Sequence, residues 1–256
     1  MLGKEICISF PIKRIISLVP SQTELLYDLG LDEEVIGITK FCVHPEEWFR
    51  NKTRIGGTKQ LNIEKIQSLK PDLIIANKEE NEKEQIEILE KYFPVWTSDI
   101  KNVDDALRMI HSVGMLVNKE EDVERISQTI ISRFGKLQKT ALPKRVAYFI
   151  WYKPWMSVGG DTFINDIIER IGWENVLKDR LRYPEITLEE LADYNPELIL
   201  LSSEPFPFKE KHIAEVKKIL PNAEVKLVDG EMFSWYGSRM MKAVDYFKEL
   251  IRGSAS

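Results

Sequence analysis

Residues 63–76 read Ile63-Glu-Lys-Ile-Gln-Ser-Leu-Lys-Pro-Asp-Leu-Ile-Ile-Ala76, and the chain repeats this pattern as Leu188-Glu-Glu-Leu-Ala-Asp-Tyr-Asn-Pro-Glu-Leu-Ile-Leu-Leu201. Each copy has a short helical pattern, a proline, and then an apolar run typical of a buried strand. Two copies of one plan predict two similar lobes. We expect a ligand to be held in the cleft between these lobes.

Each copy is preceded by a strand-like run, and these two runs resemble each other. Arg14-Ile-Ile-Ser-Leu-Val-Pro-Ser-Gln-Thr-Glu24 leads from a strand pattern into a helical one, and Arg145-Val-Ala-Tyr-Phe-Ile150 opens the second half. Ser21 with Glu24 fits a capping box at the start of the first helix. Strands that alternate with helices predict an α/β fold with mainly parallel sheets flanked by helices. Ligands gather at the carboxyl ends of such strands, which makes Ser21 a candidate contact.

The same patterns divide the chain into parts. Asn118, followed by Glu121, is expected to cap a helix of about twenty residues, roughly 30 Å long, which can cross from one lobe to the other. One long rigid helix permits only small lobe rotations. The predicted parts are an N-terminal lobe (1–117), a connecting helix (118–140), a C-terminal lobe (141–252), and a flexible tail or cloning remnant (253–256).

Length, charge and cysteine content narrow the class of protein. With 256 residues, 43% of them hydrophobic, the chain can bury a sizeable core. A net charge of -5, with lysines and arginines interleaved among the acids, offers no basic patch for nucleic acid. Cys7 and Cys42 lie too far apart for a zinc motif and are too few for a disulfide scaffold. We expect no membrane-spanning run and find no export signal in the first residues.

Aromatic residues follow several predicted strands. Rings in such loops form flat walls for a planar or amphipathic ligand, although for any single ring an anchoring role in its loop is favoured. Their gathering at strand ends favours a ligand wall for the set. The residues concerned are Trp151, Trp155, Phe206, Trp235 and Tyr236.

One motif that contains glycine and one that contains cysteine can each be interpreted in two ways. Gly159-Gly160-Asp161-Thr162 resembles an anion-binding turn, or it is a tight turn in which Asp161 or Thr162 caps a helix. Cys42 and His44 could together ligate a metal, or they are a buried thiol and a loop imidazole. Because no further His or Cys motif completes a set, we predict no dedicated metal site.

Arg239 is a single cation beside the aromatic pair Trp235-Tyr236. It could hold a ligand carboxylate or phosphate, or it could form a structural salt bridge. An alternative class of protein, a cytosolic enzyme or metal-handling protein, would use Arg239 together with Cys42, His44 and Asp161. Nothing in the spacing of these residues selects a reaction.

In its two repeated runs and in Arg14–Leu25, the chain resembles the solute-binding proteins of ABC importers for cobalamin, haem and ferric siderophores. The resemblance covers roughly residues 13–251 and is greatest to the cobalamin-binding branch. It implies a monomer without catalysis or an intrinsic cofactor, whose ligand is cobalamin, haem or a ferric chelate. It also implies a periplasmic or cell-surface location, whereas the missing export signal leaves a cytoplasmic one open.

The resemblance implies roles for particular residues. Glu64 and Glu189 would dock to arginines of an ABC permease dimer, and both precede the proline of their repeat by the same number of residues. Phe41, Tyr183 and Trp151 would form ligand walls. Where the cobalamin binder has tryptophans, this chain has Thr58 and Asn77, so a more polar pocket floor is expected.

These observations predict a solute-binding protein that holds a metal chelate or a corrinoid-like or tetrapyrrole-like ligand by aromatic contacts and a few polar ones. The predicted ligand-binding residues are Ser21, Phe41, Cys42, His44, Trp151, Trp155, Tyr183, Phe206, Trp235, Tyr236 and Arg239.

Overall fold

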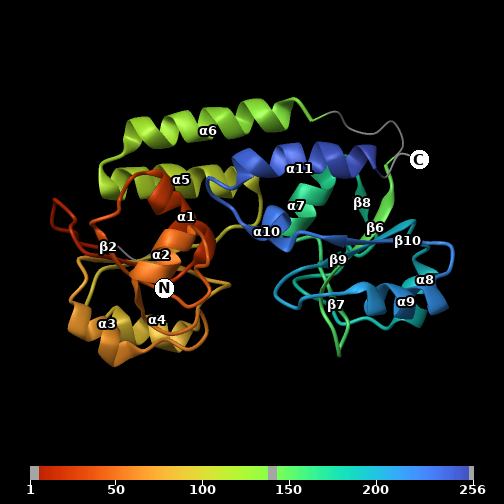
Figure 1. Ribbon diagram of the computed structural model, residues 1–256, viewed down its shortest axis with the longest axis horizontal. Coiled ribbons are helices and arrows are strands. Elements are labelled where there is room, and N and C mark those ends of the chain that lie inside the picture. The colour runs from red at the N-terminus through yellow and green to blue at the C-terminus, as the bar shows by residue number, and fades with distance from the viewer. Residues whose placement is uncertain (1–5, 138–142, 254–256) are drawn as a thin grey trace. The chain divides into compact units, whose positions relative to one another are not determined.

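The computed structural model describes residues 6–137 and 143–253. The chain forms two compact units. Unit 1 holds the described residues up to Ile100, with Asp104–Ile130 and Trp235–Met241, and unit 2 holds the other described residues. Each unit is a layered α/β structure, which confirms the predicted fold class (Figure 1).

The sheet of unit 1 is entirely parallel. Its strands lie in the order β3-β2-β1-β4-β5. The central strands are buried on both faces, as expected for runs of isoleucine and leucine between helical layers. The strands are β1 (Ile15–Ser17), β2 (Val35–Ile38), β3 (Thr53–Arg54), β4 (Leu73–Asn77) and β5 (Val95–Ser98).

The first helix begins differently from the sequence prediction. In α1 (Pro20–Asp28), Val19 is the cap residue and no side chain caps the helix, so the predicted capping box of Ser21 and Glu24 is wrong. Proline at the first helical position already has a helical backbone and no N–H to satisfy. The carboxylate of Glu24 is also held elsewhere, by Arg239. The other helices that begin in the first half are α2 (Glu46–Asn51), α3 (Ile63–Leu69), α4 (Lys83–Leu89), α5 (Val103–Val117) and α6 (Glu120–Gly135).

Asn118 ends one helix rather than starting the next. Its φ of 57° is left-handed, and the N–H of Lys119 donates to the carbonyl oxygen of Gly114 at 2.8 Å. This is the geometry of a helix carboxyl-terminal cap, which asparagine tolerates. The expected amino-terminal cap at Asn118 is therefore wrong, and α6 begins at Glu120.

The chain passes from unit 1 to unit 2 within α6, between Ile130 and Ile131. Residues 138–140 of the predicted connecting helix and residues 254–256 of the predicted tail lie outside the described residues. The proposed lobe boundaries stay predictions.

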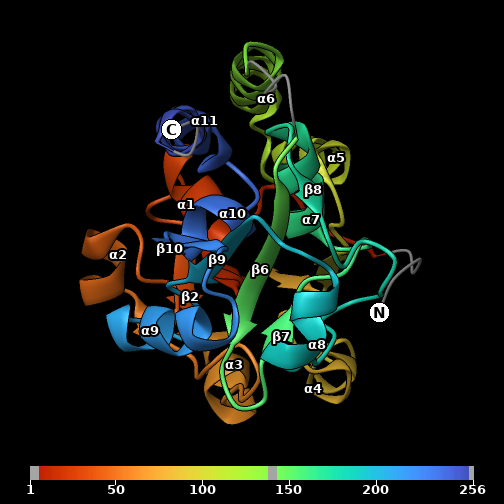
Figure 2. The same ribbon diagram turned by 90° about the vertical axis from the view of Figure 1, so that its right-hand side faces the viewer.

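Unit 2 has a mainly parallel sheet in the order β10-β9-β6-β7, and β8 pairs with the beginning of β6. Only β7 runs antiparallel to its neighbour among these described strands. Figure 2 shows β6 as the long strand of this sheet, with β8 and α7 near its beginning. The strands are β6 (Arg145–Trp151), β7 (Met156–Ser157), β8 (Glu174–Asn175), β9 (Leu198–Ser202) and β10 (Glu224–Val228).

The helices of the second half are short except for the last one. They are α7 (Phe163–Arg170), α8 (Leu188–Asp193), α9 (Glu210–Ile219), α10 (Gly230–Ser234) and α11 (Met240–Arg252). Across the residues that the structure describes, no helix has the length and apolar character needed to cross a bilayer.

Candidate functional site

Phe41 presents an exposed ring just beyond the carboxyl end of β2. Half of the residue is exposed (50%), and the ammonium of Lys40 lies 5.1 Å from the ring centroid. A Cβ atom at Gly57 would lie only 3.1 Å from Cε2 of Phe41, so glycine leaves the room that this ring occupies. The structure therefore places Phe41 as an exposed ring at the edge of the sheet where the parallel strands of unit 1 end.

Cys42 lies beneath this surface. Its side chain is fully buried, and Sγ lies 3.1 Å from Oγ1 of Thr23 and 3.2 Å from Oγ1 of Thr39. Burial raises the pKa of the Cys42 thiol, which keeps it protonated and unsuited to bind a metal as a thiolate. Within residues 6–137 and 143–253 no cluster of three His, Cys, Asp or Glu side chains is placed to hold a metal ion.

His44 belongs to a line of contacts that ends at a buried ion pair. Its ring lies edge-on to Trp235, with centroids 5.5 Å apart, and the guanidinium of Arg239 lies 4.5 Å from the Trp235 centroid. Nε and Nη2 of Arg239 donate to the carboxylate of Glu24 at 2.7 and 3.1 Å. Both charged side chains are almost fully buried. Arg239 was expected either to hold a ligand anion or to form a structural salt bridge, and the structure contains the salt bridge.

The neighbours of this line are also buried. Ser21 and Tyr236 are both under a tenth exposed. Gly237 has a φ of 116°, and a Cβ atom there would lie 3.2 Å from the carbonyl oxygen of Ser21. The segment Trp235–Met241 thus packs closely on α1, and Ser21, Trp235 and Tyr236 are less accessible than Phe41.

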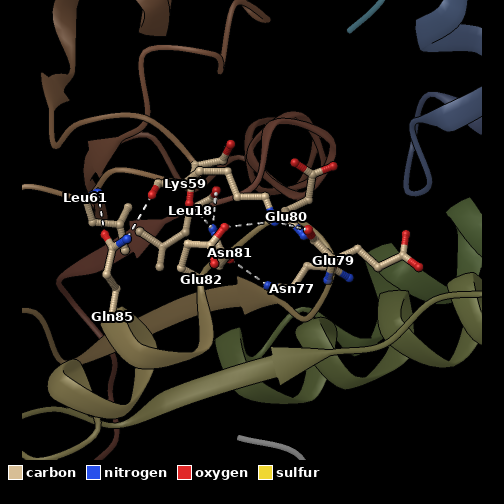
Figure 3. Close-up of polar contacts among 10 residues, drawn as sticks. Leu18, Lys59, Leu61, Asn77, Glu79, Glu80, Asn81, Glu82 and Gln85 are labelled. Carbon is tan, nitrogen blue, oxygen red and sulfur yellow. Dashed lines mark hydrogen bonds and ion pairs between the residues drawn. The ribbon is translucent and has the colours of Figure 1, made fainter. Parts of the chain in front are cut away.

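Buried amides, which the sequence analysis did not single out as a group, fix the loop after β4 (Figure 3). Nδ2 of Asn81 donates to the carbonyl oxygens of Leu18 and Thr58 at 3.3 and 3.1 Å, and its Oδ1 accepts from the backbone N–H of Asn77 at 2.9 Å. Nδ2 of Asn77 donates to Oγ of Ser98 at 3.1 Å. The side chains of Asn77 and Asn81 therefore both fix the conformation of this loop. Two asparagines four residues apart after a strand are the signal that could have indicated it.

Unit 2 gathers rings at the end of β6. Trp151 is 40% exposed and lies edge-on to Phe206, with centroids 5.9 Å apart. Trp155 stacks on Phe208 at 5.6 Å. Of the predicted rings in this cluster, Trp151 is the most exposed, whereas Trp155 and Phe206 pack largely against their neighbours. His212, which is not among the predicted site residues, lies within the same cluster.

Gly159 and Gly160 do not form an anion-binding turn. Their N–H groups donate to the carbonyl oxygens of Arg182 and Arg180 at 2.7 and 2.9 Å, so they are not available to an anion. Cβ atoms at these glycines would lie within 2.3 Å of backbone carbonyl oxygens. Thr162 caps α7 by accepting from the N–H of Asn165, as the alternative expectation has it.

Asp161 and Tyr183 both contact Arg182. The backbone N–H of Arg182 donates to Oδ1 of Asp161, and the Arg182 guanidinium lies 5.6 Å from the ring centroid of the half-buried Tyr183. The carbonyl oxygen of Pro184 accepts from the N–H of Ser157 in β7 at 3.0 Å. The predicted wall residue Tyr183 is thus fixed beside the edge of the sheet of unit 2.

Glu64 and Glu189 occupy the same position in the repeated helices. Asn62 caps α3 and Thr187 caps α8 through their side chains, and each glutamate is the second residue of its helix. Both are exposed, and neither forms an ion pair among the described residues. A carboxylate at this position is stabilised by the helix dipole and remains accessible to a partner.

Comparison with known proteins identifies the family. The periplasmic binding protein family model matches residues 15–226, and the chain belongs to this family. A vitamin B12-binding protein of Pectobacterium carotovorum subsp. carotovorum is 27% identical over 241 residues, covering 90% of this chain and 85% of that protein.

Solved structures share the fold. The periplasmic vitamin B12-binding protein BtuF of Vibrio cholerae has a TM-score of 0.77 at 22% identity, covering 97% of this chain and all (100%) of that one. The periplasmic haem-binding protein RhuT of Roseiflexus sp. RS-1 has a TM-score of 0.82 at 19% identity, covering 96% and 100%. These relatives are binding proteins, and the two-lobed α/β fold is common to them and to this chain.

Proposed function

We propose that this chain is a non-enzymatic solute-binding protein that holds a metal chelate or a corrinoid-like or tetrapyrrole-like ligand and delivers it to an ABC importer. The observation that carries the proposal is the exposed ring at a strand end in each unit, Phe41 and Trp151, in a chain related over most of its length to vitamin B12-binding proteins. Cobalamin, haem and ferric chelates are the candidate ligands. The cleft between the lobes stays the predicted place of binding.

The polar side chains that the sequence singled out support binding rather than catalysis. The Cys42 thiol is buried and protonated, Arg239 bonds Glu24, and Asp161 bonds Arg182. The enzyme or metal-handling alternative would need these same groups for chemistry. Because each of these groups has a partner within the protein, a structural role is favoured for each. In this proposal the chelate is the transported ligand and not an intrinsic cofactor.

The partner in this proposal is a permease dimer that contacts Glu64 and Glu189. Support comes from their matched positions in two capped helices and from their exposure. A monomer presents one such carboxylate on each unit, which suits a partner built from two similar subunits.

Single ring deletions test the proposal. A buried aromatic contact contributes roughly 1.5–3 kcal/mol, so a few contacts can support micromolar affinity after ordering costs. Phe41→Ala and Trp151→Ala are each expected to weaken binding of cyanocobalamin or haemin by about tenfold or more, measured by isothermal titration. Thermal unfolding should change little because both rings are exposed.

Tyr92→Ala is the matched control, since Tyr92 is an exposed ring (61%) outside the proposed site. It should leave affinity unchanged. Equal affinities for wild type, Phe41→Ala and Trp151→Ala would reject these rings as ligand walls.

A further inference from the structure

Three lysines follow strand ends in unit 1, and two of them are held by acidic residues or backbone. Nζ of Lys78 donates to Oδ2 of Asp99 at 2.8 Å. Nζ of Lys59 donates to the carbonyl oxygen of Glu79 at 2.6 Å and lies 3.5 Å from the carboxylate of Glu82. Both ammonium groups are therefore paired with oxygens of the protein at its surface.

Lys40, the third of these lysines, has no carboxylate partner among the described residues. It is exposed, and its ammonium lies 5.1 Å from the centroid of the Phe41 ring. Its backbone N–H donates to the carbonyl oxygen of Gly56 at 2.8 Å, which fixes where the side chain starts. A Cβ atom at Gly57 would lie 3.1 Å from Cε of Lys40, so the stem lies against the space above this glycine. The ammonium is therefore held beside the most exposed ring of the site in unit 1.

Arg239, the cation that the sequence singled out, differs from Lys40 in both burial and pairing. Its guanidinium is bonded to the carboxylate of Glu24 through two nitrogens and is almost fully buried. Pairing leaves Arg239 with little attraction for a further anion, whereas an exposed ammonium keeps both its charge and its donors. The role in anion binding that the sequence predicted for Arg239 fits Lys40 better.

We propose that Lys40 binds an anionic oxygen group of the ligand, a carboxylate or a phosphate, while Phe41 contacts the adjacent flat part of the same ligand. This inference rests on the proposed function and narrows the ligand class to chelates that carry a negative substituent next to a planar surface. An exposed ammonium can donate up to three hydrogen bonds and attract the anion at the same time. Lys40 is thus a specificity-determining residue.

Pairs of ligands that differ in one anionic group test this role. Haemin carries two carboxylates and its dimethyl ester carries none, whereas cyanocobalamin carries a phosphate that dicyanocobinamide lacks. In low salt, Lys40→Met should weaken binding of the anionic member of the relevant pair about fivefold and leave the uncharged member unchanged. Lys40→Arg should retain most of the affinity. Raising the ionic strength should bring wild type towards Lys40→Met.

Lys78→Met is the matched control, because it removes a lysine of the same length that is already paired. It should not change the difference between the two members of either pair. An effect confined to the haemin pair identifies a carboxylate, and one confined to the cobalamin pair identifies a phosphate. If Lys40→Met lost equal affinity for charged and uncharged ligands, or lost none for either, the inference would be overturned. Binding by wild type would in that case still uphold the proposed function. Both the inference and the proposed function would be contradicted if wild type bound none of these four ligands and no ferric chelate.

Discussion

Glu24→Ala is expected to lower the free energy of unfolding by about 3–5 kcal/mol, because it removes a buried carboxylate to which the buried guanidinium of Arg239 donates through two nitrogens. Nε and Nη2 of Arg239 donate to this carboxylate at 2.7 and 3.1 Å, and the two side chains are only 7% and 6% exposed. Water cannot readily replace the lost partner. Urea denaturation of wild type and variant measures the difference.

Two further variants separate the lost charge from the lost packing. The double variant Glu24→Ala/Arg239→Met should recover much of the stability, because it replaces both members of the buried pair at once. Glu46→Ala breaks the exposed pair with Arg50 and should cost about 1 kcal/mol or less. A loss for Glu24→Ala as small as that of Glu46→Ala would contradict the importance assigned to the buried pair.

Asn81→Ala is expected to lower the free energy of unfolding by about 3 kcal/mol or more, since each buried polar group left without its partner costs about 1–3 kcal/mol. The carbonyl oxygens of Leu18 and Thr58 and the N–H of Asn77 all bond to this one amide, and all four residues are buried. The loop after β4 should loosen as well. Denaturant unfolding measures the stability, and amide hydrogen exchange at residues 77–81 measures the loop.

Gln85→Ala is a control from the same region (Figure 3). Its side chain also makes two bonds to backbone, with the N–H of Leu61 and the carbonyl oxygen of Lys59, at 2.6 and 2.8 Å. Because Gln85 is partly exposed, water can replace these bonds, and the expected loss is about 1 kcal/mol. Equal losses for Asn81→Ala and Gln85→Ala would show that burial does not set the cost.

The long apolar strands were predictable and the two-residue strands were not. β6 extends the run quoted at 145–150 by one residue, and β4 and β9 each end one residue beyond the quoted repeats, at Asn77 and Ser202. β3, β7 and β8 have two residues each, which is too short to show any periodicity. These short strands form because their neighbours already present unpaired backbone groups, which is a property of the folded chain.

The sequence indicated two exposed rings of the candidate site, but it did not indicate the partners of the polar residues. Phe41 and Trp151 follow strand ends in the sequence, and the structure exposes both. The pairing of Arg239 with Glu24 joins residues 215 positions apart, and no local pattern indicates such a contact. Lys40 was overlooked because an exposed lysine has no distinguishing sequence signal until the partners of the other cations are known.

Titration of the wild-type protein with cyanocobalamin, haemin and a ferric hydroxamate, followed by quenching of tryptophan fluorescence, tests the central claim most directly. We predict saturable binding of at least one of these chelates, with one ligand per chain and a Kd of about 1 µM or lower. If none of the three changes the fluorescence or remains bound after equilibrium dialysis, this protein is not a carrier of metal chelates.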